Sequence, residues 1–190
     1  MAPQSISIVE AAEGDALALA SVMTASYSAS DASFPLIYDA APPGTHDRLA
    51  VQFLFTPVQT PNRKTFKAVD DNTGRLVGFA SWSVPIGAEV PTALEGGDEE
   101  LAETPGINTA LWLRKMSSLG SPPRSSDTVD DIGLAFMFVH PEYYGQGIGS
   151  KLLKWGTNEA DKRGVKIWLT STPQAIPVYQ KKGWEITKEH

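Results

Sequence analysis

The alternation of apolar and polar residues predicts three strands in the first half of the chain. Ser5 to Glu10 has apolar residues at alternate positions and is expected to form the first strand. Phe66 to Val69 and Leu76 to Trp82 have the composition of strands, and Asp70 to Gly74 between them contains the residue types that favour turns. These segments therefore predict an antiparallel hairpin.

Apolar residues with helical spacing predict two helices near the N-terminus. The first is expected to begin at Asp15, a residue type that favours the N-cap. The second is expected from about Thr45 to Phe55. It is expected to end near Pro57, because a proline disfavours the helical conformation of the residue before it. Ser28 to Gly44 is rich in Ser, Ala and Pro and predicts a loop.

The pattern changes between Val84 and Val129, where prolines and an acidic run predict a loop-rich insertion. A short helix is expected inside it, from about Asn108 to Ser117. The carboxylates of this segment could attract a cationic amine, although a solvated loop more often explains such a run. Trp82 and Trp112 could line an apolar pocket or pack in the core.

The C-terminal third predicts a strand, a helix and a second parallel strand. Ile132 to Val139 is a nearly continuous apolar run, which is typical of a strand buried on both faces. A glycine-rich loop follows, and then a helix from about Ile148 to Arg163 that Gly164 would end. Such a crossover joins parallel strands. The remaining segments are expected to form a strand, a short helix and a final strand: Val165 to Thr170, Pro173 to Lys182 and Gly183 to Thr187.

Composition narrows the function classes. The 190 residues, 42% of them hydrophobic, are expected to form one domain over residues 1–190 that carries the insertion. The chain has no cysteine and three scattered histidines, so a metal centre is not expected. A net charge of -6 without a basic cluster argues against nucleic-acid binding. Since neither a signal peptide nor a membrane-crossing run is apparent, we expect a cytoplasmic protein.

Gly145, Gly147 and Gly149 lie between the apolar strand and the helix. Glycines let the backbone approach a ligand closely, and the first amides of a helix attract anions, so this loop predicts a pyrophosphate site. A tight turn without a ligand is the alternative. The P-loop and the dinucleotide fingerprint do not fit, because Gly-Lys-Ser/Thr is missing and the third glycine comes one residue early.

The stretch FVHPEYYGQGIGSKLLKWG resembles the signature of the GCN5-related N-acetyltransferases (GNAT). In that family a strand ending in Val-x-Pro precedes Arg/Gln-x-x-Gly-x-Gly/Ala and a helix. The segment from Ala175 to Trp184 resembles the second signature, a short helix with a tyrosine followed by Lys-x-Gly and an aromatic residue. The resemblance is close from about residue 130 to 187 and implies a mixed, twisted α/β (α+β) sheet flanked by helices.

The resemblance also implies an acetyl-CoA site. Backbone groups of Met137, Phe138 and Val139 would pair with the pantetheine arm like an added strand. Thr172 stands where the family often has a polar residue that touches the cofactor. The loop residues implied to hold the pyrophosphate are Tyr144, Gly145, Gln146, Gly147, Ile148, Gly149 and Ser150. Tyr144 departs from the usual Arg or Gln, so a charge-assisted contact is lost there.

Acyl transfer to an amine needs an acid for the departing thiolate, and Tyr179 is the candidate from both its chemistry and the resemblance. Packing between helix and sheet is the alternative role of this tyrosine. Asp131 is the candidate base, directly or through a water, although adjacent acids before a strand more often form a solvated turn. His140 is more often structural in such a turn, and Thr170 stands where some relatives have an acidic residue.

The sequence thus predicts an acetyl-CoA-dependent N-acetyltransferase that acts on a small-molecule or peptide amine. A non-catalytic acyl-CoA-binding or regulatory module is the alternative. The acceptor stays open among polyamines, amino acids, antibiotics, peptide N-termini and lysine side chains. Relatives often add a strand after the segment that ends at Thr187. Either this sheet is shorter, a neighbouring chain of a homodimer completes it, or the sequence is trimmed.

Overall fold

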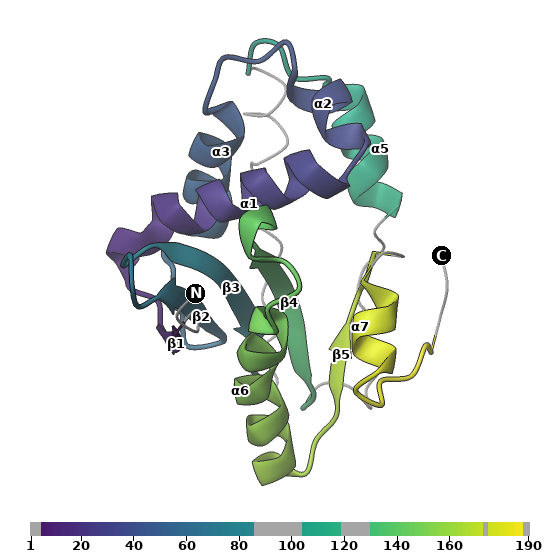
Figure 1. Ribbon diagram of the computed structural model, residues 1–190. Helices are drawn as coiled ribbons and strands as arrows, with labels where there is room; N and C mark the ends of the chain where they lie inside the picture. The colour runs from purple at the N-terminus through teal and green to yellow at the C-terminus, as the bar shows by residue number, and fades with distance from the viewer. Residues whose placement is uncertain (1–4, 86–103, 119–129, 173–174, 188–190) are drawn as a thin grey trace.

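The computed structural model describes residues 5–85, 104–118, 130–172 and 175–187, within which five strands form one mixed sheet in sequential order (Figure 1). β1, β2, β3 and β4 pair antiparallel, and only β4 and β5 are parallel. The strands are β1 (Ile6–Glu10), β2 (Arg63–Asp70), β3 (Leu76–Ser83), β4 (Ile132–Val139) and β5 (Ile167–Leu169). The predicted hairpin and the parallel crossover are confirmed.

A β-bulge divides β4 into two halves. Phe136 pairs with Ser81 and Leu134 pairs with Trp82, so Ala135 is the extra residue on β4. β5 pairs only with the first three residues of β4, Ile132 to Leu134. Beyond this point the direction of β4 diverges from that of β5 (Figure 1). Among the described residues, the second half of β4 therefore has a neighbouring strand on one side only.

Helices cover both faces of the sheet. α1 packs on one face, with Phe136 and Phe138 of β4 directed toward it, and α3 packs against α1. α6 packs on the other face, against Ile132 and Met137 among others. The helices are η1 (Glu13–Asp15), α1 (Ala16–Ser30), α2 (Ser33–Tyr38), α3 (Thr45–Leu54), α5 (Thr109–Ser118), η3 (Pro141–Tyr143), α6 (Ile148–Arg163) and α7 (Ile176–Gln180). None of the described helices is long and apolar enough to cross a membrane.

Three sequence expectations are wrong in detail. The expected loop from Ser28 to Gly44 contains the end of α1 and the whole of α2, because the Asp31 carboxylate accepts hydrogen bonds from the backbone N–H and hydroxyl of Ser33 and so starts a new helix. β4 is fully buried only over Ile132–Leu134, since β5 covers no more of it. The segment from Gly183 to Thr187 is not a strand, because Trp184 folds back onto Tyr179.

Other expectations on the insertion are met in part. The short helix expected from about Asn108 is confirmed as α5, whereas residues 86–103 and 119–129 lie outside the described residues. Trp82 is fully buried in the core, which decides against a role as a pocket wall. Trp112 is half-buried and lies close to the Tyr38 side chain of α2.

The packing of Trp82 depends on Gly156 in the middle of α6. A Cβ atom built on Gly156 would lie 2.3 Å from Cη2 of the Trp82 ring, a separation that real Cβ atoms essentially never show. The Trp82 ring in turn lies 6.0 Å from that of Trp155. Gly156 therefore sets how closely α6 approaches the sheet, and with it the position of the first turn of α6.

Gly156→Ala is expected to destabilise the protein by about 1–3 kcal/mol, because overpacking exceeds the gain in helix propensity. Urea unfolding followed by circular dichroism measures this change. Gly14→Ala is the matched control, since nothing lies within 4 Å of a Cβ at Gly14. Equal stability of the two variants would contradict this account of α6 packing.

Candidate functional site

The gap between β4 and β5 exposes a length of backbone. The His140 amide donates to the carbonyl oxygen of Val77 at 2.8 Å, so the backbone groups of Phe138, two residues earlier, also face β3. Those of Met137 and Val139 consequently face away from β3, toward the gap. Buried backbone groups require partners, so this edge of β4 is suited to pair with an extended ligand.

The glycine loop lies where β4 leads into α6. Gly145 and Gly147 have positive φ angles of 77° and 75°, which other residues rarely adopt, and nothing lies within 4 Å of a Cβ at either position. No side chain in the described part of the chain caps α6, and the first turn of α6 carries no acidic residue. The first amides of this 16-residue helix are therefore available to an anion.

Gly149 differs from the other two glycines. It has an ordinary helical conformation, and a Cβ added there would lie 3.7 Å from Cε of Met137, which is normal contact. Neither backbone strain nor internal packing therefore requires a glycine at this position. Close approach of a ligand does explain it, and Met137 connects this turn directly to the open edge of β4.

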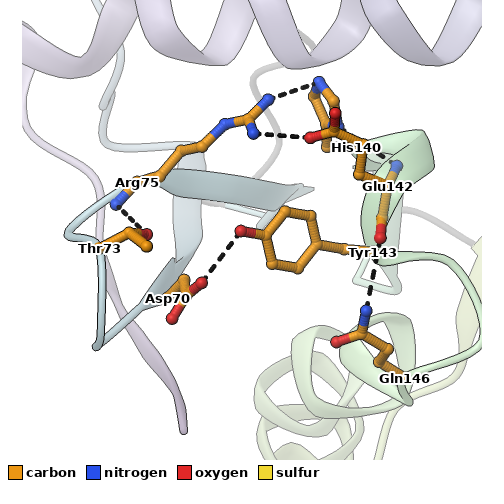
Figure 2. A network of polar contacts seen from close by, with 7 residues as sticks. All are labelled: Asp70, Thr73, Arg75, His140, Glu142, Tyr143 and Gln146. Carbon is orange, nitrogen blue, oxygen red and sulfur yellow. Dashed lines mark hydrogen bonds and ion pairs between the residues drawn. The ribbon is translucent and has the colours of Figure 1, made fainter. Parts of the chain in front are cut away.

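A polar network anchors the segment that precedes the loop (Figure 2). Arg75, just beyond the β2–β3 turn, donates to Glu142 at 2.7 Å and contacts Nε2 of His140 at 2.8 Å. The Tyr143 hydroxyl donates to the buried Asp70 carboxylate at 3.0 Å. Burial and the Arg75 charge lower the pKa of His140, which is therefore neutral and can accept the hydrogen bond. These contacts fix the start of the glycine loop against the hairpin.

Two side chains of the loop itself are also held. Gln146 donates to the Glu142 carbonyl oxygen at 3.5 Å, at the edge of the network in Figure 2. The Tyr144 hydroxyl lies 3.1 Å from the Ser26 hydroxyl of α1, and 49% of the Tyr144 side chain is exposed. Tyr144 therefore joins the glycine loop to α1.

Tyr179 lies in α7, beside β5 (Figure 1). It is only 9% exposed and belongs to the same core cluster as Leu134 of β4. Its ring packs against Trp184 with centroids 5.6 Å apart. Burial raises the pKa of Tyr179 to about 12, so its hydroxyl is protonated at neutral pH and available as a donor.

The other predicted residues occupy more peripheral places. Asp131 accepts a hydrogen bond from the Lys166 amide at 2.9 Å, at the end where β4 and β5 meet. It precedes the Ala135 bulge by four residues, about 13 Å along a strand. The exposed Thr172 caps α7 through its carbonyl oxygen, and Ser150 is exposed in the first turn of α6.

An aromatic cluster on the other face of the sheet was not predicted. The ring of Tyr27 lies 5.0 Å from that of Phe138 on β4 and 5.8 Å from that of His46. Phe34 and Tyr38 of α2 complete the cluster around His46, and burial lowers the pKa of this histidine to about 4. The sequence signal was the spacing of aromatic residues in the segment that was interpreted as a loop.

Sequence comparison supports the family resemblance over the C-terminal third. The acetyltransferase (GNAT) domain family matches residues 120–186. Mycothiol acetyltransferase of Nocardiopsis dassonvillei is 38% identical over 52 residues. That alignment spans 27% of this chain and only 16% of the relative.

Solved structures extend the likeness to the whole fold. A histone acetyltransferase HPA2 and related acetyltransferase of Corynebacterium glutamicum has a TM-score of 0.58 at 20% identity, over 94% of this chain and 84% of that one. A predicted acetyltransferase of Clostridium acetobutylicum, solved with acetyl-CoA, has a TM-score of 0.55 at 17% identity, over 98% and 94%. Aminoglycoside 6'-N-acetyltransferase of Acinetobacter baumannii has a TM-score of 0.56 at 12% identity, over 98% of this chain and 95% of that one. Residues 120–186, which contain the glycine loop and the Tyr179 segment, therefore match the acetyltransferase (GNAT) domain family, and the chain as a whole has the fold of these solved acetyltransferases.

Proposed function

We propose that this protein transfers the acetyl group of acetyl-CoA to a primary amine of a small molecule or peptide. One observation carries the proposal: the open edge of β4 at Met137 and Val139 leads to the uncapped first turn of α6. An extended arm with hydrogen-bonding amides, joined to a pyrophosphate, matches both parts of this surface. A free nucleotide would use only the second part.

Each predicted cofactor residue has a role in this proposal. The backbone groups of Met137 and Val139 would pair with the pantetheine arm, and Phe138 would support them through its pairing with β3. The amides from Tyr144 to Ser150 would surround the pyrophosphate. Thr172, beyond the end of β5, would contact the far side of the arm. Acetyl-CoA itself would supply the activated thioester.

The chemistry proceeds by direct attack. The neutral nitrogen of the acceptor attacks the thioester carbonyl carbon, a carbon–nitrogen bond forms, and the carbon–sulfur bond breaks to give a thiolate. Tyr179 donates its hydroxyl proton to the sulfur and regains one from water. The nitrogen gives its extra proton to water. A backbone N–H near the Ala135 bulge would stabilise the developing oxyanion.

The pH dependence follows from the raised pKa of Tyr179. The acid must be protonated, and with a pKa of about 12 Tyr179 stays protonated up to a pH of about 10. Only the acceptor amine, which must lose its proton, then shapes the profile, so activity should rise with pH up to about 10 and show no decline there. A tyrosine with its ordinary pKa would begin to ionise in that range.

The base is assigned to water. Asp131 already accepts the Lys166 amide and lies at the closed end of the gap, so we propose that it holds the β4–β5 junction. A non-catalytic acyl-CoA-binding module is the second candidate function. The identity of Tyr144 favours this module. The Tyr144 hydroxyl contacts the Ser26 hydroxyl, whereas the family has at this position a residue that can contact the cofactor.

Gly149→Ala is expected to separate stability from cofactor binding. Alanine fits beside Met137 and is the better helix former, so the free energy of unfolding should rise by about 0.5–1 kcal/mol. The added methyl would stand between the amides and the pyrophosphate, so the Kd for acetyl-CoA should rise at least about tenfold. Calorimetric titration and urea unfolding measure the two effects. Unchanged affinity for acetyl-CoA in this variant, or no binding of any acyl-CoA by the wild-type protein, would contradict the proposal.

Tyr179→Phe is expected to lower kcat by about 100-fold, the order of a lost general acid, while the Kd for acetyl-CoA stays within about twofold. Because the chain has no cysteine, a thiol-reactive dye reports only the CoA that is released. The assay is run over a panel of amines. Full activity of this variant would remove the acid role, and acetyl-CoA binding without turnover on any amine would favour the binding module.

A further inference from the structure

The ammonium group of Lys115 lies against the aromatic cluster around Tyr27. Nζ of Lys115, in α5, lies 5.0 Å from the centroid of the Tyr27 ring and forms an ion pair with the Asp31 carboxylate. The Lys115 and Asp31 side chains are each 21% exposed. A carboxylate beside the face of an aromatic ring is the chemistry that recognises an ammonium group. The ammonium group of Lys115 thus occupies a site with the chemistry to bind an ammonium group.

The position of this site relates it to the gap in the sheet. The Tyr27 ring contacts the ring of Phe138, whose neighbours Met137 and Val139 turn their backbone groups toward the gap. Asp31 follows the last turn of α1, and its other carboxylate oxygen accepts two hydrogen bonds from Ser33, at 2.9 Å and 2.6 Å. The carboxylate is therefore held in place independently of Lys115.

We propose that Asp31 and Tyr27 form an ammonium subsite for the acceptor, in which Lys115 is the resident cation when no acceptor is bound. This inference rests on the proposed acetyl transfer. The group held there is not the nucleophile, because a carboxylate and an aromatic face favour the charged form of an amine, whereas attack requires the neutral form. The subsite therefore selects acceptors with two amino groups, such as an aliphatic diamine.

Displacement of Lys115 is energetically accessible. One ammonium replaces another, so the charge of the site does not change, and the Asp31 carboxylate keeps a cationic partner throughout. The Lys115 side chain is long and can return its charge to water. The resident cation should thus weaken diamine binding by a factor of up to about five without preventing it.

Two substitutions test the subsite. Lys115→Met keeps most of the apolar stem and removes the competing cation, so the KM for diamines should fall by about fivefold. Asp31→Asn keeps an oxygen for Ser33 but loses the charge, so the KM for diamines should rise by about tenfold. The probes are the diamines from diaminopropane to diaminohexane. The alkylamine of each length is the matched control, and its KM should be the same in all three proteins.

A purely structural clasp between α5 and α1 predicts a different outcome. Both variants would then lower the melting temperature, and neither would distinguish diamines from monoamines, which would overturn the subsite. Calorimetric titration of diaminopentane into the protein with bound CoA gives a readout without turnover. If no amine releases CoA but the diamine still binds more tightly to Lys115→Met and more weakly to Asp31→Asn, the subsite stands and the proposed transfer fails. Equal affinity in the three proteins refutes the subsite.

Discussion

The parting of β4 from β5 is the constraint on which the rest of the structure depends. The strands pair only from Ile132 to Leu134, and the bulge at Ala135 reverses the side to which the following residues point. Ile132 donates its amide to the carbonyl oxygen of Lys166 in the closed part of the junction. Beyond the bulge, no strand of the described residues pairs with Met137 and Val139 on the side that faces away from β3. A strand paired on both sides at Leu134 thus becomes an open edge at Met137.

α6, the glycine loop and α1 are each fixed in position around this edge by specific contacts. α6 is set against the sheet by the contact of Gly156 with Trp82, and its first turn contacts Met137. The network from Arg75 to Glu142 fixes the start of the glycine loop (Figure 2). On the opposite face α1 carries Tyr27 against β4 and reaches the loop through the contact of Ser26 with Tyr144. The glycine loop and the aromatic cluster around Tyr27 thus both contact α1.

The sequence predicted the parts of the fold that local patterns encode. The apolar run of β4, the turn residues of the hairpin and the glycines at both ends of α6 each act over a few residues, so their elements are confirmed. The family resemblance covered the same segments. α2 was missed because its start depends on two hydrogen bonds to Asp31 in a segment otherwise rich in loop formers. The length of β5 and the fold-back of Trp184 depend on tertiary pairing, which no local pattern reports.

The candidate site was predictable in its residue types but not in its geometry. The loop amides and Tyr179 follow from motifs, whereas the pKa of about 12 at Tyr179 arises from burial that only the fold creates. The bulge leaves no signal in the residue identities around Ala135. The ion pair of Lys115 with Asp31 joins residues on two separate helices and could not be inferred from spacing.

Amide hydrogen exchange of β4, read residue by residue by NMR, tests the central claim most directly. The amides of Met137 and Val139 should exchange readily in the free protein and become protected by about 100-fold or more when acetyl-CoA binds, because each gains a hydrogen-bond partner. The amide of Phe138, which faces β3, should be protected in both states. Acetyl-CoA binding that leaves the exchange of Met137 and Val139 unchanged would contradict the account.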